Sequence, residues 1–184
     1  MGPLEGLKKP KEVIFFDGDG TLWYPRTSLR TRKPHWVYLD ETVADPIAEM
    51  VATPKAEATL RQLGERGIRR VLMSTSPLEE EEALAHRRAI AEHVGILDLL
   101  DDINVAPEVV NGKAQRIAAW LLRHNVAPER ALMVGDTYQW DIVAANSVGV
   151  EGLLLDSEHE AEVIRQNGIT DMVIGELSDI VPLL

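Results

Sequence analysis

The hydrophobic pattern of the chain alternates between short apolar runs and longer amphipathic stretches. A short continuous apolar run is typical of a strand buried on both faces, and apolar residues three or four apart are typical of a helix. The apolar runs predict strands at residues 13–16, 70–73, 103–105, 131–134, 152–155 and 172–174. The amphipathic stretches predict helices at about residues 54–66, 77–94, 113–124, 141–148 and 157–166.

Several of the predicted helices have recognisable ends. The segment Ser-Pro-Leu-Glu at residues 76–79 has the order of a capping box, and Thr53-Pro54 offers a similar helix start. Glycines at positions 67, 95, 149 and 168 are placed to end helices. Short strands separated by single helices predict a three-layer, Rossmann-like α/β fold, with a parallel sheet covered by helices on both faces. We expect residues 1–184 to form one domain.

The stretch at about residues 23–52 interrupts this alternation. It has no clear period and contains three prolines and several aromatic residues. Long loops in compact domains are usually functional or disordered, and the aromatic residues argue against disorder. We therefore expect an extended loop or flap inserted into the domain at this point.

Composition and charge narrow the class of protein. The chain has a net charge of −11 and no cysteine, which argues against nucleic acid or an acidic membrane as a general partner and excludes disulfides and thiolate chemistry. No apolar stretch approaches the length of a membrane span or a signal peptide. These features favour a cytoplasmic protein.

The chemistry is expected where the strands end, because ligands collect at the carboxyl ends of parallel strands. The run at residues 13–16 is followed by Asp17 and Asp19, the next run by Ser74, and a later one by Asp136. Two carboxylates in a protein core would be costly. At an open edge they can hold a cation or attack an electrophile, and the intervening glycines let the backbone bend sharply. The five histidines, His159 among them, show no metal-ligand spacing, and we interpret them as surface or packing residues.

Four segments taken together resemble the haloacid dehalogenase superfamily, and specifically its phosphatases. They are a strand followed by D-x-D-G-T at residues 17–21, a strand ending in serine at residues 71–74, a helix opened by Lys113, and a strand followed by G-D-x-x-x-x-D at residues 135–141. All four occur in order, each in the expected context. The resemblance covers about residues 13–149. The Thr-Leu-Trp start at residues 21–23 also resembles the magnesium-dependent phosphatase-like subgroup.

This resemblance implies a role for each aspartate. Asp17 would attack phosphorus and form an aspartyl-phosphate, and it would also bind the metal. Asp19 would protonate the leaving oxygen and later deprotonate water, while its backbone carbonyl binds the metal. Asp136 would bind the metal directly, and Asp141 would do so directly, through water or through Lys113. The implied cofactor is Mg²⁺, which prefers oxygen ligands.

The same resemblance implies the phosphate-binding residues. Ser74 and the amides after it would bind phosphoryl oxygens, and Thr75 would take this role if the strand register shifts by one residue. Against that shift, Ser76 is better used as the helix cap. Lys113 would neutralise charge on the nucleophile and on the transferring group.

The segments between the motifs are too short for the family's full helical cap, so the resemblance implies a minimal cap or none, and an open site. One hypothesis is that the inserted loop lines the entrance through Trp23, Arg30 and Arg32 and reads the leaving group, with the arginines contacting a second anion. The competing interpretation, which we prefer, is that these cations pair with nearby acids.

The resulting hypothesis is a Mg²⁺-dependent phosphomonoester hydrolase that acts on a small-molecule phosphate ester or a phosphoprotein. The alternatives are a phosphotransferase or phosphomutase of the same superfamily, and a non-enzymatic, receiver-like phospho-binding module, which would not need an acid at Asp19. Because members with little cap often use a neighbouring subunit as a lid, self-association is also considered.

Overall fold

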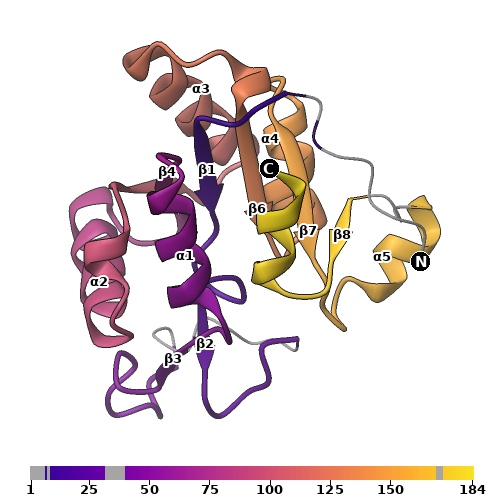
Figure 1. The fold of residues 1–184 in the computed structure, drawn as a ribbon. Helices are drawn as coiled ribbons and strands as arrows, with labels where there is room; N and C mark the ends of the chain where they lie inside the picture. The colour runs from indigo at the N-terminus through magenta and orange to yellow at the C-terminus, as the bar shows by residue number, and fades with distance from the viewer. Residues whose placement is uncertain (1–6, 8, 32–39, 169–171) are drawn as a thin grey trace.

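Each predicted apolar run forms a strand of one sheet in the computed structural model, which describes residues 7, 9–31, 40–168 and 172–184. The strands are β1 Val13–Phe16, β2 Trp23–Pro25, β3 Met50–Ala52, β4 Arg69–Ser76, β5 Asp102–Pro107, β6 Ala131–Gly135, β7 Glu151–Leu155 and β8 Val173–Ile174. Six of them form a parallel sheet in the order β5-β4-β1-β6-β7-β8 (Figure 1). The central position of β1 places the residues after it between the ends of β4 and β6.

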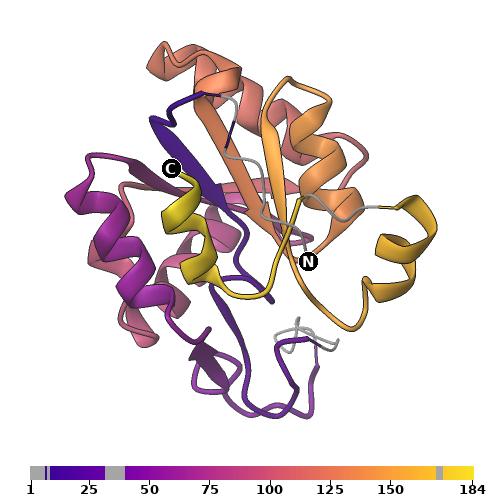
Figure 2. The ribbon, with the colours of Figure 1, turned by 45° about the vertical axis from the view of Figure 1, so that its right-hand side comes forward.

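Helices cover both faces of this sheet. They are α1 Ala56–Glu65, α2 Glu80–His93, α3 Gly112–His124, α4 Ala144–Asn146 and α5 Ala161–Asn167, with the shorter or tighter turns η2 Leu97–Leu99, η3 Pro128–Arg130, η4 Tyr138–Val143 and η5 Leu177–Leu183. Buried residues of α1, α2 and η5 belong to one hydrophobic cluster, and buried residues of α3 and α4 to another. The C-terminal η5 lies beside α1 in both views (Figures 1 and 2). The expected three-layer α/β fold is therefore confirmed.

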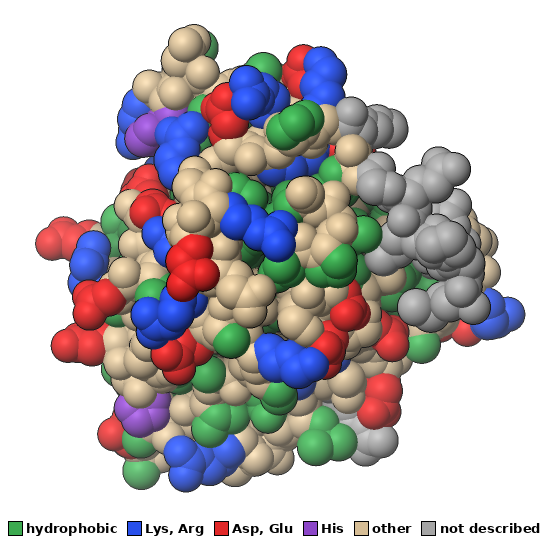
Figure 3. Space-filling model, viewed as in Figure 1, with side chains coloured by type: hydrophobic (Ala, Val, Ile, Leu, Met, Phe, Trp, Pro, Cys, Tyr) green, Lys and Arg blue, Asp and Glu red, His purple; other side chains and the backbone are tan. Residues whose placement is uncertain are grey.

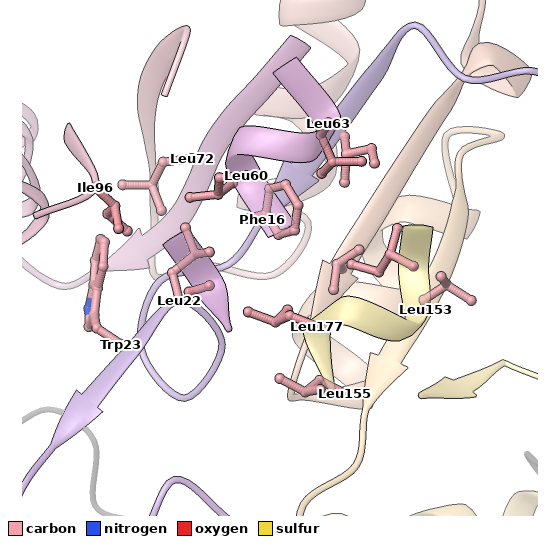
Figure 4. Packing of buried hydrophobic residues seen from close by; sticks show 14 of the residues in the cluster. Phe16, Leu22, Trp23, Leu60, Leu63, Leu72, Ile96, Leu153, Leu155 and Leu177 are labelled. Carbon is pink, nitrogen blue, oxygen red and sulfur yellow. The ribbon is translucent and has the colours of Figure 1, made fainter. Parts of the chain in front are cut away.

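The two clusters follow from the alternation of side chains along each strand. In β1, Ile14 and Phe16 face the first cluster, whereas Val13 and Phe15 face the second. Figure 4 shows Phe16 pointing toward Leu60 of α1, within the first cluster. Because both faces are buried, every residue of β1 is apolar. This explains why a continuous apolar run, and not an alternating one, marked the strand.

The predicted helix starts are wrong in detail, whereas the predicted ends are confirmed. Ser76 still belongs to β4, where it pairs with Pro107, and α2 begins only at Glu80 without a side-chain cap. The Ser76 hydroxyl instead accepts a hydrogen bond from the amide of Leu78, at 3.2 Å. Helix α1 likewise begins without a cap from Thr53. The four glycines expected to end helices all have positive φ, between 61° and 80°.

The inserted stretch contains a two-stranded antiparallel ribbon, in which Trp23 of β2 pairs with Ala52 of β3. In Figure 1 the ribbon lies below the carboxyl end of β1. The sequence showed no period here because each of these strands has only three residues. In the described part of the insertion, the ribbon is the only regular structure.

On the face shown in Figure 3, Asp and Glu side chains are spread over the surface and mixed with Lys and Arg side chains. Among the residues that the structure describes, none of the helices has the length and apolar character needed to cross a membrane.

Helix α2 contains a histidine that predicts how stability changes with pH. Burial, together with the neighbouring Arg87, lowers the pKa of His86 from 6.5 to about 4. The folded state therefore favours neutral His86. The contribution of this residue to the free energy of unfolding is complete above pH 6.5 and is lost as the pH falls toward 4. The full shift corresponds to about 3 kcal/mol, which partial exposure reduces to about 1–2 kcal/mol.

We therefore expect His86→Gln to flatten the decrease in the free energy of unfolding between pH 7 and pH 4.5, measured by urea denaturation. His93→Gln, at the exposed end of the same helix, is the matched control. An unchanged pH dependence in His86→Gln would contradict the expectation.

Candidate active site

Asp17 is the first residue beyond the central strand β1. Its amide donates a hydrogen bond to the carbonyl of Val134, at 2.9 Å, which continues the pairing with β6 by one residue. The carboxyl ends of the neighbouring strands thus bring Asp136, after β6, to the same edge of the sheet. The side chain of Asp17 is 12% exposed, so it is mostly buried but still reaches solvent.

Lys113 connects two of the predicted aspartates. It lies in the first turn of α3, and its ammonium is 2.7 Å from Asp17 Oδ1 and 2.5 Å from Asp141 Oδ1. The residue before Lys113 must be a glycine, because a Cβ at Gly112 would lie 2.4 Å from the carbonyl oxygen of Pro107. The lysine is buried, so it is held between the two carboxylates rather than in solvent.

The charges in this group shift one another's pKa values. Burial by itself would lower the pKa of Lys113, but the attraction of Asp141 and Asp17 raises it well above its ordinary value. Burial raises the pKa of Asp141 to about 7, with repulsion from Asp17 and Asp136 acting in the same direction and Lys113 opposing it. In the absence of a further cation, the cluster thus resists carrying its full negative charge.

Asp17, Asp136 and Asp141 form the candidate metal site. Each offers one carboxylate oxygen, and these three oxygens lie within 4.8 Å of one another. All three residues are buried, and buried carboxylates need a compensating cation. Oxygen-only ligands suit Mg²⁺, so the residues present fit the expected cofactor.

The side chain of Asp141 is oriented by its own turn. Residues Tyr138–Val143 form a single π-helical turn, η4, a feature that is frequent at functional sites. Asp141 Oδ2 accepts a hydrogen bond from the amide of Thr137, at 3.0 Å. The second oxygen therefore remains directed at Lys113.

Asp19 lies apart from this group and has a different set of partners. The indole Nε1 of Trp23 donates to Asp19 Oδ1 at 2.9 Å, and Arg87 Nη2 lies 2.8 Å from Asp19 Oδ2. Trp23 is fully buried and lies next to Ile96 in the core (Figure 4). The expectation that Trp23 lines the entrance is therefore wrong, because its ring is needed in the hydrophobic cluster and its indole nitrogen is used by Asp19.

Ser74 and Thr75, the two candidates for the phosphate-binding residue, both lie within β4, so their side chains point to opposite faces of the sheet. A Cβ at Gly18 would lie 3.3 Å from Ser74 Oγ. Ser74 is thus the one placed against the loop that carries Asp17 and Asp19.

His159, interpreted from the sequence as a surface or packing residue, lies at the site. Its Nε2 is 3.1 Å from Asp136 Oδ2, and its Nδ1 is 3.2 Å from the carbonyl oxygen of Thr31 in the insertion. The signal that was available is its position shortly after the carboxyl end of β7. His159 thus contacts a candidate metal ligand, and such contacts tune metal sites. Its interpretation as a plain surface or packing residue is therefore wrong.

Of the two arginines expected at the entrance, the structure describes Arg30 and not Arg32. Arg30 donates to the carbonyl of Asp156, at 2.6 Å, and lies within 3.5 Å of the carbonyl oxygen of Gly20. Burial lowers the pKa of Arg30, opposed by the attraction of Asp136 and Asp156. Arg30 therefore lies beside the candidate site. Arg32 lies outside the described residues.

Comparisons with known proteins indicate the family to which the chain belongs. The model of the haloacid dehalogenase-like hydrolase family matches residues 28–149, which is more than half of the chain. A ribulose-1,5-bisphosphate 5-phosphatase of Halopiger xanaduensis is 30% identical over 146 residues, covering 73% of this chain and 59% of the relative. A glyceraldehyde 3-phosphate phosphatase of Methanothermobacter thermautotrophicus is 28% identical over 137 residues, covering 71% and 58%. The chain thus spans less than two thirds of the length of these relatives.

Solved structures share the fold. A phosphatase of this superfamily from Thermococcus onnurineus superposes with a TM-score of 0.66 at 19% identity, covering 94% of this chain and 97% of the other. L-2-haloacid dehalogenase from Xanthobacter autotrophicus gives 0.63 at 14% identity, covering 94% and 98%. With most of its length matched by the family model, the chain belongs to the haloacid dehalogenase-like hydrolases.

Proposed function

We propose that this protein is a Mg²⁺-dependent phosphomonoester hydrolase that forms an aspartyl-phosphate on Asp17. The observation that carries the proposal is the environment of Asp17. Lys113 contacts the Asp17 carboxylate at 2.7 Å, and Asp17 lies in one group of carboxylates with Asp136 and Asp141. A carboxylate repels a phosphate monoester unless cations screen the charge between them. Lys113 and a metal at this group would provide that screening.

Asp19 supports phosphoester hydrolysis over dehalogenation. The fold itself does not decide the reaction, since a haloacid dehalogenase shares it. Halide leaves as a stable anion, whereas the alcohol of a phosphate ester leaves well only when its oxygen receives a proton. Asp19, which lies two residues after Asp17 and is 5% exposed, would supply that proton.

In the first step, a carboxylate oxygen of Asp17 forms a bond to phosphorus and the bond from phosphorus to the leaving oxygen breaks. The proton of Asp19 moves to that leaving oxygen, which departs as an alcohol. In the second step, water gives a proton back to Asp19 and attacks phosphorus. The bond to Asp17 then breaks and inorganic phosphate is released.

Charge neutralisation accompanies both steps. Lys113 stabilises negative charge on Asp17 and on the transferring group, and Ser74 would donate a hydrogen bond to a phosphoryl oxygen. When bound by Asp17, Asp136 and Asp141, Mg²⁺ would supply further neutralisation between the carboxylate and the phosphate. Positioning and electrostatics of this kind account for most of the catalysis of phosphoryl transfer.

The substrate class that we propose is small phosphorylated sugars. The names of the two relatives state that they act on ribulose 1,5-bisphosphate and on glyceraldehyde 3-phosphate. A panel of sugar phosphates, assayed by phosphate release, would identify the preferred member, and turnover of phosphoproteins alone would contradict this part of the proposal.

Replacing the nucleophile gives a direct test of the mechanism. We expect Asp17→Asn to reduce turnover of para-nitrophenyl phosphate by a factor of about 1,000 or more, because an amide oxygen does not form the intermediate. Asp98→Asn, an exposed aspartate of η2, should keep wild-type turnover. Retention of the wild-type rate by Asp17→Asn, or failure to trap an acyl-phosphate in a rapid quench of the active wild type, would exclude the mechanism.

Removal of metal tests the carboxylate group. Treatment with EDTA should abolish turnover, and Mg²⁺ should restore it. Because the cation relieves repulsion among buried carboxylates, Mg²⁺ should also raise the Tm of the metal-free protein. This thermal shift should be lost in Asp136→Asn. Full turnover with EDTA present would contradict the metal requirement.

Gly135 offers a second test of the same group. A Cβ at this position would lie 2.2 Å from Asp141 Cγ, so Gly135→Ala must displace the Asp141 side chain. We expect Mg²⁺ affinity, measured by calorimetry, to fall by about 10- to 100-fold, as for other disturbed metal sites. Gly175→Ala is the matched control, since its Cβ would meet only Asp179 Oδ2, at an ordinary 3.6 Å. Equal Mg²⁺ affinity in the two variants would argue against Asp141 as a ligand.

A further inference from the structure

Arg87 is a charged residue on the buried face of α2. The other buried residues of this helix are Ala83, Ile90 and Ala91, and Arg87 itself has no exposed surface. A guanidinium in such a place is costly unless it is paired and hydrogen-bonded. The position therefore requires a specific partner, and the sequence motifs of the site gave Arg87 no role.

The partner of Arg87 is the predicted acid. Arg87 Nη2 lies 2.8 Å from Asp19 Oδ2, and the same nitrogen donates to the carbonyl of Thr75, at 3.0 Å. One guanidinium thus connects the loop after β1 with the end of β4, where the predicted phosphate-binding residue Ser74 also lies. The relative position of Asp19 and Ser74 depends in part on this side chain.

The other oxygen of Asp19 is held from the opposite direction. Trp23 Nε1 donates to Asp19 Oδ1 at 2.9 Å, and the indole is itself enclosed, because a Cβ at Gly18 would lie 2.7 Å from its Cζ2. Each carboxylate oxygen has two lone-pair positions. The hydrogen bond at Oδ1 and the ion pair at Oδ2 therefore hold the Asp19 carboxylate from two directions.

We propose that Arg87 and Trp23 are positioning residues for proton transfer by Asp19, and that they act on the leaving-group step more than on phosphate binding. This inference rests on the proposed phosphatase function. Proton transfer requires the acid to lie within hydrogen-bond reach of the leaving oxygen, and small displacements of a catalytic group reduce rates strongly. A carboxylate held by a buried hydrogen-bond donor at one oxygen and by a buried guanidinium at the other is restricted in position, as proton transfer requires.

Leaving-group dependence separates this role from a merely structural one. Para-nitrophenolate leaves readily without a proton, whereas an alkoxide does not. We expect Arg87→Gln to reduce kcat/KM for glycerol 3-phosphate at least tenfold more than kcat/KM for para-nitrophenyl phosphate. Arg87→Lys, which keeps the charge, should recover part of this difference. Arg88→Gln, the exposed neighbour on the same helix, should leave both values unchanged.

Two further variants keep the test decisive if Arg87→Gln does not fold. Trp23→Phe retains an aromatic ring and removes the donor to Asp19, so it should show the same selective loss on glycerol 3-phosphate. In an Asp19→Asn background, Arg87→Lys should add no further selective loss, because the residue acts through Asp19.

The outcomes distinguish this inference from the proposed function. An active wild type whose Trp23 and Arg87 variants lose the same factor on both phosphate esters would overturn the positioning role alone. So would a selective loss that persists in the Asp19→Asn background. A wild type that hydrolyses neither ester, nor any sugar phosphate, would overturn the proposed function and this inference with it.

Discussion

The repulsion among three buried carboxylates is the constraint on which the site depends. Asp17, Asp136 and Asp141 bring oxygens within 4.8 Å of one another, and Lys113 contacts two of the three side chains. Three carboxylates and one ammonium leave two negative charges, which is the charge that a divalent cation cancels. The pKa of Asp141 is raised by the same excess of negative charge, since burial and two neighbouring carboxylates oppose its ionisation. A divalent cation bound by these carboxylates would relieve this imbalance.

The parallel sheet makes this concentration of charge possible. Asp17 and Asp136 follow neighbouring strands, β1 and β6, and Lys113 is supplied by the helix that follows β5. Asp19 is only two residues from Asp17, yet its partners are Arg87 and Trp23 rather than Lys113. Two carboxylates close in sequence therefore lie in separate electrostatic environments. Such separation is how one site obtains both a nucleophile and an acid–base group from the same residue type.

The strands and the aspartates were predictable because their signals are local. Four apolar residues followed by Asp17 identify a buried strand and its end without reference to the rest of the chain. Arg87 and His159 contact the site through residues that are distant in the sequence, Asp19 and Asp136, and no motif records such contacts. Each still left a signal: Arg87 is a charge on an apolar helix face, and His159 follows the end of a strand. The helix start near Ser76 was mispredicted because pairing with β5 extends β4 through that residue.

The insertion is connected to the chemistry at two points, and this changes how its residues are understood. At one end Trp23 is buried in the core and donates to Asp19. Further along, the carbonyl of Thr31 contacts His159, which in turn contacts Asp136, while Arg30 donates to the backbone after β7. These contacts involve Asp19, the proposed acid–base residue, and Asp136, a candidate metal ligand. The described part of the insertion therefore contacts the candidate site directly, and we expect changes in its sequence to disturb Asp19 and Asp136.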